Sequence, residues 1–204
     1  MPAVWDRAEG ALAAAARAAG LDFVEQPGEG AFYGPKLEFA LGGSQGRHWQ
    51  CGTIQVDFVL PERLEARYVD EHNARPRPVI LHHAVLGSIE RFVAMLLEHY
   101  AGNLPLWLAP EQILCAPIGA GQDGYARHVG ASLTERGYRV ALDCRPQRLP
   151  RKIVDAHALG IPILLALGRR EAAAETVVLR RSDGRQESVA LARLDEALRA
   201  EAFP

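Results

Sequence analysis

The spacing of apolar and polar residues predicts a helix, three strands and a second helix in the first half of the chain. Apolar positions recur at helical spacing before Gly20, whereas three later segments are short apolar runs separated by turn residues. Ser88 is placed to cap a helix with one apolar face. The predicted elements are a helix over 2–20, strands over 36–41, 48–60 and 78–83, a surface connection over 63–77, and a helix from Ser88 to about Tyr100.

In the second half the pattern changes to strand–helix alternation, which is typical of an α/β unit with a mostly parallel sheet. Proline-rich residues 104–110 have linker composition, so we expect domains over 1–107 and 108–204. The predicted elements are strands over 112–117, 138–143, 161–167 and 176–181, helices over 122–136, 151–159 and 189–202, and a turn over 182–185.

Composition narrows the setting in which the chain works. No apolar run reaches about 18 residues, so we expect no transmembrane helix, and the first residues lack the basic and apolar regions of a signal peptide. The three cysteines are widely spaced and include no Cys-x-x-Cys pair, as expected of buried thiols in a reducing compartment. These features predict a cytoplasmic protein.

The net charge of −2 is unevenly distributed. Residues 1–107 hold 9 Lys/Arg and 13 Asp/Glu, whereas residues 108–204 hold 14 and 12. A polyanionic partner would favour the second half. An ordinary solvated surface explains this small difference equally well.

The first half also contains polar residues inside apolar strands. In a strand alternate residues share a face, so Gln55 and Asp57 are expected to point the same way, joined by Thr53 if no bulge intervenes. Such a face suits the recognition of a small polar ligand. The pattern gives equal weight to a sheet whose polar face is in water.

An ordered set of motifs resembles the threonyl-tRNA synthetases, which are class II aminoacyl-tRNA synthetases. The matching stretches are Trp5-Asp-Arg-Ala-Glu9, Gly28-Glu-Gly-Ala-Phe-Tyr-Gly-Pro-Lys36, Trp49-Gln-Cys-Gly-Thr53, Gln55-Val-Asp-Phe58, Leu86-Gly-Ser-Ile-Glu-Arg-Phe92 and Trp107-Leu-Ala-Pro110. The resemblance implies an α/β chain: part of an antiparallel-sheet catalytic domain, then an anticodon-binding domain with a mostly parallel sheet.

The resemblance also implies site residues in the first half. Arg91 corresponds to the motif 3 arginine that contacts ATP, a role that suits a planar and permanently charged guanidinium. His82 corresponds to one of three zinc ligands, and the other two have no counterpart in this sequence, so Zn²⁺ is expected only if a complementary half supplies them. The remaining implied positions are Gln50 and Thr53 for ATP, and Tyr33, Lys36, Gln55 and Ser88 for the threonine pocket.

Motif 1, motif 2 and the editing domain also have no counterpart in the sequence. The resemblance therefore implies a chain that contributes to ligation of threonine to tRNA(Thr), with ATP and Mg²⁺, but that is not competent alone. We expect a complementary N-terminal half or a partner synthetase, and self-association through uncovered strand edges. The alternatives are a noncatalytic module that binds tRNA or a synthetase, and a small-molecule sensor.

In the second half, residues 145–152 contain four cations and no acid. This is either a solvated basic loop or an RNA contact. Pro146 stands where the family has asparagine and Gly160 where it has arginine, and both differences remove hydrogen-bond donors that could select the anticodon. The tRNA-binding candidates are Arg148, Arg151, Glu171 and Arg180.

Overall fold

The computed structural model describes residues 2–43 and 46–203, and it divides the chain into two units, residues 1–95 and 96–204. In the described part of the chain, no helix is long and apolar enough to cross a membrane. Residues 104–110 do not form a free linker, because Leu106 and Ala109 are buried within the second unit. The domain boundary between residues 107 and 108 stays a prediction.

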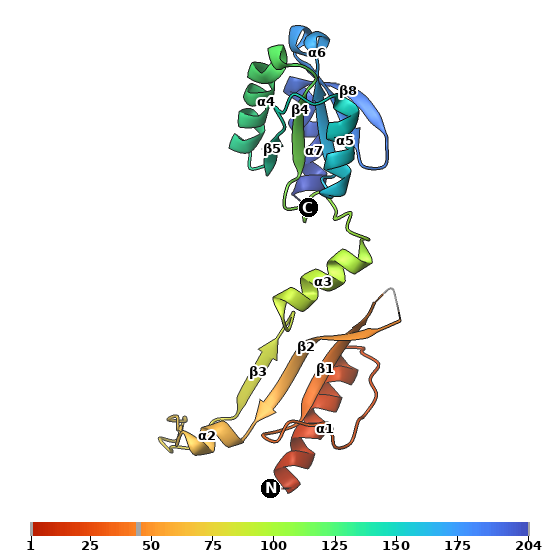
Figure 1. Cartoon of the computed structure of the whole chain (residues 1–204). Helices are drawn as coiled ribbons and strands as arrows, with labels where there is room; N and C mark the ends of the chain where they lie inside the picture. The colour runs from red at the N-terminus through yellow and green to blue at the C-terminus, as the bar shows by residue number, and fades with distance from the viewer. Residues whose placement is uncertain (1, 44–45, 204) are drawn as a thin grey trace. The chain divides into compact units, whose positions relative to one another are not determined.

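The first unit is a three-stranded antiparallel sheet in the order β1-β2-β3 (Figure 1). Helix α1 packs against β1, and Ala8 and Ala16 are buried there. The elements are α1 (Pro2–Ala18), β1 (Lys36–Gly42), β2 (His48–Asp57), α2 (Val59–Arg63), β3 (Ile80–Ala84) and α3 (Ile89–His99), which spans the division between the units.

Strand β2 ends three residues earlier than the sequence predicted. The carboxylate of Asp57 accepts hydrogen bonds from the backbone N–H groups of Val59 (2.8 Å) and Leu60 (3.0 Å). These are donors that the first turn of a helix leaves unpaired, so Asp57 favours a helix here over a longer strand. The predicted strand over 48–60 is therefore wrong at its end, where α2 begins.

Strand β2 also contains a bulge that the sequence did not reveal. Phe39 pairs with Gly52, but the next residue of β1, Ala40, pairs with Gln50, so Cys51 is an extra residue in β2. A one-residue bulge reverses the alternation of side chains. Gln50 therefore lies on the same face as Thr53, which strict alternation would place on the opposite face.

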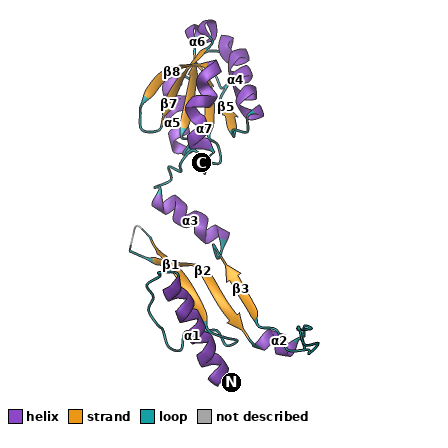
Figure 2. Ribbon diagram, turned by 180° about the vertical axis from the view of Figure 1, so that it is seen from behind, coloured by secondary structure: helices purple, strands orange, loops and turns teal. Residues whose placement is uncertain are grey.

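The second unit is a three-layer α/β structure with strand order β5-β4-β6-β7-β8. Helices α4 and α7 contribute to the core on one face of the sheet and α5 to the core on the other (Figure 2). The elements are β4 (Ile113–Pro117), η1 (Ala120–Gln122), α4 (Asp123–Glu135), β5 (Val140–Leu142), α5 (Leu149–Ala158), β6 (Ile163–Leu167), α6 (Arg169–Ala174), β7 (Thr176–Arg181), β8 (Gln186–Ala190), η2 (Leu191–Arg193) and α7 (Leu194–Ala202).

The strand directions confirm the predicted fold class. Strands β5, β4 and β6 are parallel, and β7 and β8 each run antiparallel to the preceding neighbour, so β7 alone opposes the other four described strands. Two details differ from the prediction. The helix expected from Val189 begins at Leu194, because residues 186–190 form the polar edge strand β8, and the six-residue helix α6 was not foreseen.

Candidate functional site

One face of the first sheet gathers most of the polar residues that the sequence singled out. Gln55 pairs with Lys36 of β1 and His82 of β3, and Thr53 pairs with Glu38. Directly opposite residues of antiparallel strands share a face. No register shift with β3 separates Thr53 from Asp57, and the predicted common face of Thr53, Gln55 and Asp57 therefore exists.

Asp57 and His82 form a partly buried pair at one end of this face. Asp57 Oδ2 lies 2.8 Å from His82 Nε2, and the Asp57 side chain is fully buried whereas that of His82 is 39 % exposed. Burial by itself raises the pKa of Asp57. The N–H groups of Leu60 and Val59 and the His82 ring outweigh it and hold that pKa below its ordinary value.

Tyr33 joins this pair from the loop before β1. Its hydroxyl donates to Gln55 Oε1 at 2.7 Å, and its ring centroid lies 5.8 Å from that of His82. The loop can lie this close to β2 because residue 34 is glycine, since a Cβ at Gly34 would lie 1.7 Å from the carbonyl oxygen of Val56. The structure thus brings together Tyr33, Gln55 and His82.

A second group lies beside the bulge. Lys36 forms an ion pair with Glu38, and the Gln50 amide donates to the same carboxylate at 2.9 Å. Arg91 Nη1 donates to the carbonyl oxygen of Gln50 at 3.2 Å. Two predicted ATP contacts, Gln50 and Arg91, therefore lie next to each other.

The start of α3 positions Arg91. The Ser88 hydroxyl accepts the backbone N–H of Arg91 at 3.3 Å and donates to the Glu90 carboxylate at 2.7 Å, which lowers the pKa of Glu90. Gly87 has a φ of +63°, and a Cβ there would lie 2.5 Å from the carbonyl oxygen of Cys51. The turn before α3 thus packs directly onto the bulge, and glycine permits both the approach and the conformation.

The described residues do not complete a zinc site. Among residues 2–43 and 46–203, no group of three or more His, Cys, Asp or Glu side chains is placed to hold a metal ion. The contact between His82 and Asp57 resembles the carboxylate–histidine pairs that orient metal-ligating imidazoles. It supplies one donor, and a zinc site needs three or four.

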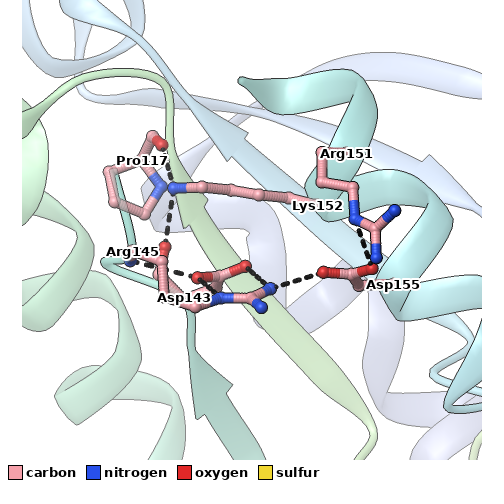
Figure 3. A network of polar contacts seen from close by, with 6 residues as sticks. All are labelled: Pro117, Asp143, Arg145, Arg151, Lys152 and Asp155. Carbon is pink, nitrogen blue, oxygen red and sulfur yellow. Dashed lines mark hydrogen bonds and ion pairs between the residues drawn. The ribbon is translucent and has the colours of Figure 1, made fainter. Parts of the chain in front are cut away.

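In the second unit, the basic segment 145–152 is largely held by carboxylates and carbonyls (Figure 3). Arg145 makes two hydrogen bonds to Asp143 (2.9 and 2.8 Å) and one to Asp155 (2.7 Å), and Arg151 Nε lies 3.0 Å from Asp155. These bonds to Arg145 lower the pKa of Asp143 despite its burial. Two of the four cations in the segment are therefore paired with carboxylates.

The other two cations of the segment differ sharply. Lys152 is 2 % exposed, and its Nζ donates to the carbonyl oxygens of Pro117 and Asp143, both at 2.8 Å. The side chain of Arg148 is exposed and has no hydrogen bond or ion pair within the described residues. Arg148 is therefore the cation of this segment that is available to an external anion.

The other candidate tRNA contacts lie apart from each other. Glu171 follows the end of β6 and accepts the N–H of Gly168 at 2.9 Å, which closes the first turn of α6. Arg180 pairs with Leu164 near the start of β6 and donates to Gln186 at 3.2 Å. The Nε atom of Arg180 is buried and has no hydrogen-bond partner in the described part of the chain.

Gly160, where the resemblance expects arginine, ends α5 with a φ of +67°. A Cβ there would lie 2.9 Å from the carbonyl oxygen of Gly102, so this backbone is adapted to glycine.

The sequence did not predict the structural roles of Asp57, Asp143 and Lys152. For Asp57, the signal was an aspartate placed before Pro61 and Glu62, as at a helix start.

Comparisons with known proteins agree with this division into two parts. The family model of the tRNA synthetase class II core domain (G, H, P, S and T) matches residues 5–100, and that of the anticodon binding domain matches residues 112–201. The threonine--tRNA ligase of Paramagnetospirillum magneticum is 52 % identical over 98 % of this chain and 32 % of its own length. That of Caulobacter vibrioides is 53 % identical over 96 % and 30 %.

Solved structures extend the likeness to three dimensions. The RNA binding domain of threonyl-tRNA synthetase from Cryptosporidium parvum Iowa II superposes with a TM-score of 0.91 at 39 % identity, covering 100 % of this chain and 52 % of that one. A threonyl-tRNA synthetase of Aeropyrum pernix gives a TM-score of 0.76 at 31 % identity, covering 97 % and 49 %.

The chain spans about a third of the length of these curated relatives. Its two matched regions follow the order expected from the motifs: the end of a class II core, then an anticodon-binding domain. The chain therefore belongs to the threonyl-tRNA synthetase family of class II aminoacyl-tRNA synthetases.

Proposed function

We propose that the chain takes part in the ATP-dependent ligation of threonine to tRNA(Thr). The observation that carries this proposal is the polar face of the first sheet, where Tyr33, Gln55 and His82 meet and Arg91 lies beside Gln50. Residues 112–201, which match an anticodon-binding domain, would hold the tRNA.

The group around the bulge suits a nucleotide. Arg91 offers a planar cation that can stack on adenine or neutralise phosphate. Gln50 and Thr53 add neutral hydrogen-bonding groups on the same face. ATP brings Mg²⁺ bound to its phosphates, and this ion neutralises charge that a single arginine cannot.

The group around Tyr33 suits a small polar substrate. Gln55 and Tyr33 fix each other through a hydrogen bond, and Lys36 lies opposite Gln55 in the sheet. Ser88 lies at the start of α3 and bonds the backbone N–H of Arg91. His82 could serve as a zinc ligand only with donors from elsewhere. Zinc would then distinguish threonine by its hydroxyl, which valine lacks.

We further propose that activity requires a complementary N-terminal half or a partner synthetase. Adenylate formation needs positive charge preorganised around the α-phosphate, and Arg91 is one part of such a clamp. The test is threonine-dependent ATP–pyrophosphate exchange by this chain mixed with the preceding part of the Paramagnetospirillum magneticum relative. Exchange should appear only in the mixture and be lost with Arg91→Ala. A mixture no more active than its components would refute the proposal.

A noncatalytic tRNA-binding module is the second candidate, and the exposed side chain of Arg148, which has no partner among the described residues, favours it. Binding should weaken with salt, because each neutralised phosphate releases a counterion. Arg148→Ala should lower affinity for tRNA, whereas Arg127→Ala on the exposed face of α4 should not. Equal effects of the two substitutions would refute the specific contact.

The first unit also supports the proposal of self-association or a partner. Strand β3 pairs only with β2 in the described sheet, and Leu81 and Val85 at this edge are 67 % and 68 % exposed. Exposed apolar edges favour pairing with another chain. A monomer by light scattering at micromolar concentration would contradict self-association.

We place the protein in the cytoplasm, where its three free cysteines stay reduced.

A further inference from the structure

Lys152 holds both ends of a short segment that leads into α5. Its Nζ donates to the carbonyl oxygen of Asp143 at 2.8 Å, and its backbone N–H donates to that of Arg148 at 3.3 Å. A further Nζ bond reaches Pro117 at the end of β4. One residue therefore closes residues 143–148, here called the 143–148 arch, onto the carboxyl ends of β4 and β5.

Hydrogen bonds inside the arch also fix its path. The Asp143 carboxylate accepts both the backbone N–H and the guanidinium of Arg145, and the N–H of Gln147 donates to the Arg145 carbonyl at 2.7 Å. Arg145 then reaches Asp155 on α5 (Figure 3). The arch is thus tied to the helix by a buried ammonium and by an ion pair.

Packing alone does not explain a lysine at this position. A buried ammonium costs more than an apolar side chain of similar volume unless it is fully hydrogen-bonded, and a methionine would fill the same space. What the ammonium provides is a fixed distance between Pro117, Asp143 and α5. The cation that this arrangement presents is Arg148, which immediately precedes α5 and whose side chain has no partner within residues 2–43 and 46–203.

We propose that Lys152 is a positioning residue for RNA binding: it preorganises the backbone of the 143–148 arch, so that Arg148 meets the tRNA without the cost of ordering that backbone. This inference rests on the proposed tRNA binding by the second unit. Preorganisation raises affinity because fewer side-chain and backbone states are lost on binding. In this arrangement Arg145 and Lys152 hold the arch, and Arg148 contacts the nucleic acid.

A double-mutant cycle tests the proposal. Affinity for a tRNA(Thr) transcript is measured by filter binding for the full chain, Lys152→Met, Arg148→Ala and the double variant, each corrected for its folded fraction by circular dichroism. Each single substitution should lower affinity about tenfold, and the double variant should lose no more than about twofold beyond either one. Losses that multiply to about a hundredfold would refute the coupling.

A second cycle leaves the buried lysine in place, so that the test does not depend on the folding of Lys152→Met. Arg145→Gln loosens the arch from Asp143 and Asp155 and should couple with Arg148→Ala in the same way. Arg151→Gln is the matched control, since it removes the same charge and also pairs with Asp155, but lies outside the arch. Its effect should multiply with that of Arg148→Ala.

The outcomes distinguish failure of the proposed tRNA binding from failure of the proposed role of the arch. If the unmodified chain shows no salt-dependent binding of tRNA, the proposed function fails. If it binds and Arg145→Gln behaves like Arg151→Gln, tRNA binding stands and the role of the arch is refuted. If Arg148→Ala has no effect, Arg148 is not the contact and the inference is refuted.

Discussion

The buried carboxylate of Asp57 offers a sharp test of how the first unit is held together. One oxygen caps α2 through two backbone N–H groups, and the other contacts His82. We consider two substitutions, Asp57→Ala and Asp57→Asn. The alanine variant removes both functions, whereas the asparagine variant keeps a carbonyl oxygen for the cap and loses the charge.

The magnitudes follow from these contacts. Loss of a helix cap costs about 1 kcal/mol, and loss of a hydrogen bond to a charged group costs about 1.5–3 kcal/mol. Because the side chain is fully buried, water cannot replace the missing contacts. We therefore expect Asp57→Ala to lower the free energy of unfolding of the first unit by about 3 kcal/mol, and Asp57→Asn by about half as much.

The assay is urea unfolding followed by circular dichroism, together with hydrogen exchange at the amides of Val59 and Leu60. The exchange measurement is needed because two units can unfold in separate transitions. Protection of both amides should fall strongly in the alanine variant and survive in the asparagine variant. Loss of less than about 1 kcal/mol with unchanged exchange in Asp57→Ala would show that Asp57 does not hold the start of α2.

The same residue predicts a pH dependence. Its pKa in the folded chain lies below the ordinary value of about 3.9, so its contribution is fully present above that value and is lost as pH falls through the folded pKa. Unfolding measured from neutral pH downwards should show this loss below about pH 4 in the unmodified chain. Asp57→Asn should show a shallower loss, and an identical acid profile would contradict the assignment.

Three further predictions concern other sites. Gly87→Ala should lower the free energy of unfolding of the first unit by about 3 kcal/mol, because the added Cβ clashes with the backbone and φ is positive. Gly28→Ala, where φ is positive but the space is open, should lower it by about 1 kcal/mol. Equal urea midpoints for the two variants would contradict this prediction. Asp143, whose pKa is lowered by Arg145, should contribute stability to the second unit that is lost at acidic pH and absent in Asp143→Asn, as unfolding at several pH values can show. Burial and a hydrogen bond to a carboxylate raise the pKa of Tyr138 to about 12, whereas an ordinary tyrosine has a pKa of about 10. An absorbance titration should therefore find a tyrosine that ionises near pH 12, and the stability of the second unit should fall as pH rises past about 10. Loss of this late ionisation in Tyr138→Phe would assign it to Tyr138, and its persistence would refute the assignment.

The sequence predicted those elements whose hydrophobic pattern is self-sufficient. Strands β4 and β6 are buried at every position and appear in the sequence as continuous apolar runs. Strand β8 is mostly exposed, and Val189 happens to fit the helical spacing of α7, so the pattern favoured a longer helix. The short helix α6 depends on Glu171 reaching back to the Gly168 N–H, a tertiary detail with little periodic signal.

The candidate site divides in the same way. The common face of Thr53 and Gln55 follows from alternation, which is local. The face of the sheet on which Gln50 lies depends on the bulge at Cys51, and the alternation of apolar and polar residues does not reveal this extra residue. In the basic segment, the four cations are visible in the sequence. The burial of Lys152 is not, because it depends on contact with the end of β4, a strand distant in sequence.

The burial of Lys152 has a consequence for covalent chemistry. The chain contains two lysines, Lys36 and Lys152, while its other side-chain cations are arginines and histidines. An amine-reactive reagent should therefore modify Lys36, whose side chain is 22 % exposed, and reach Lys152 only when α5 separates from the sheet. The rate of acylation at Lys152, measured by mass spectrometry, therefore reports how often the anticodon-binding domain opens, and no label has to be introduced.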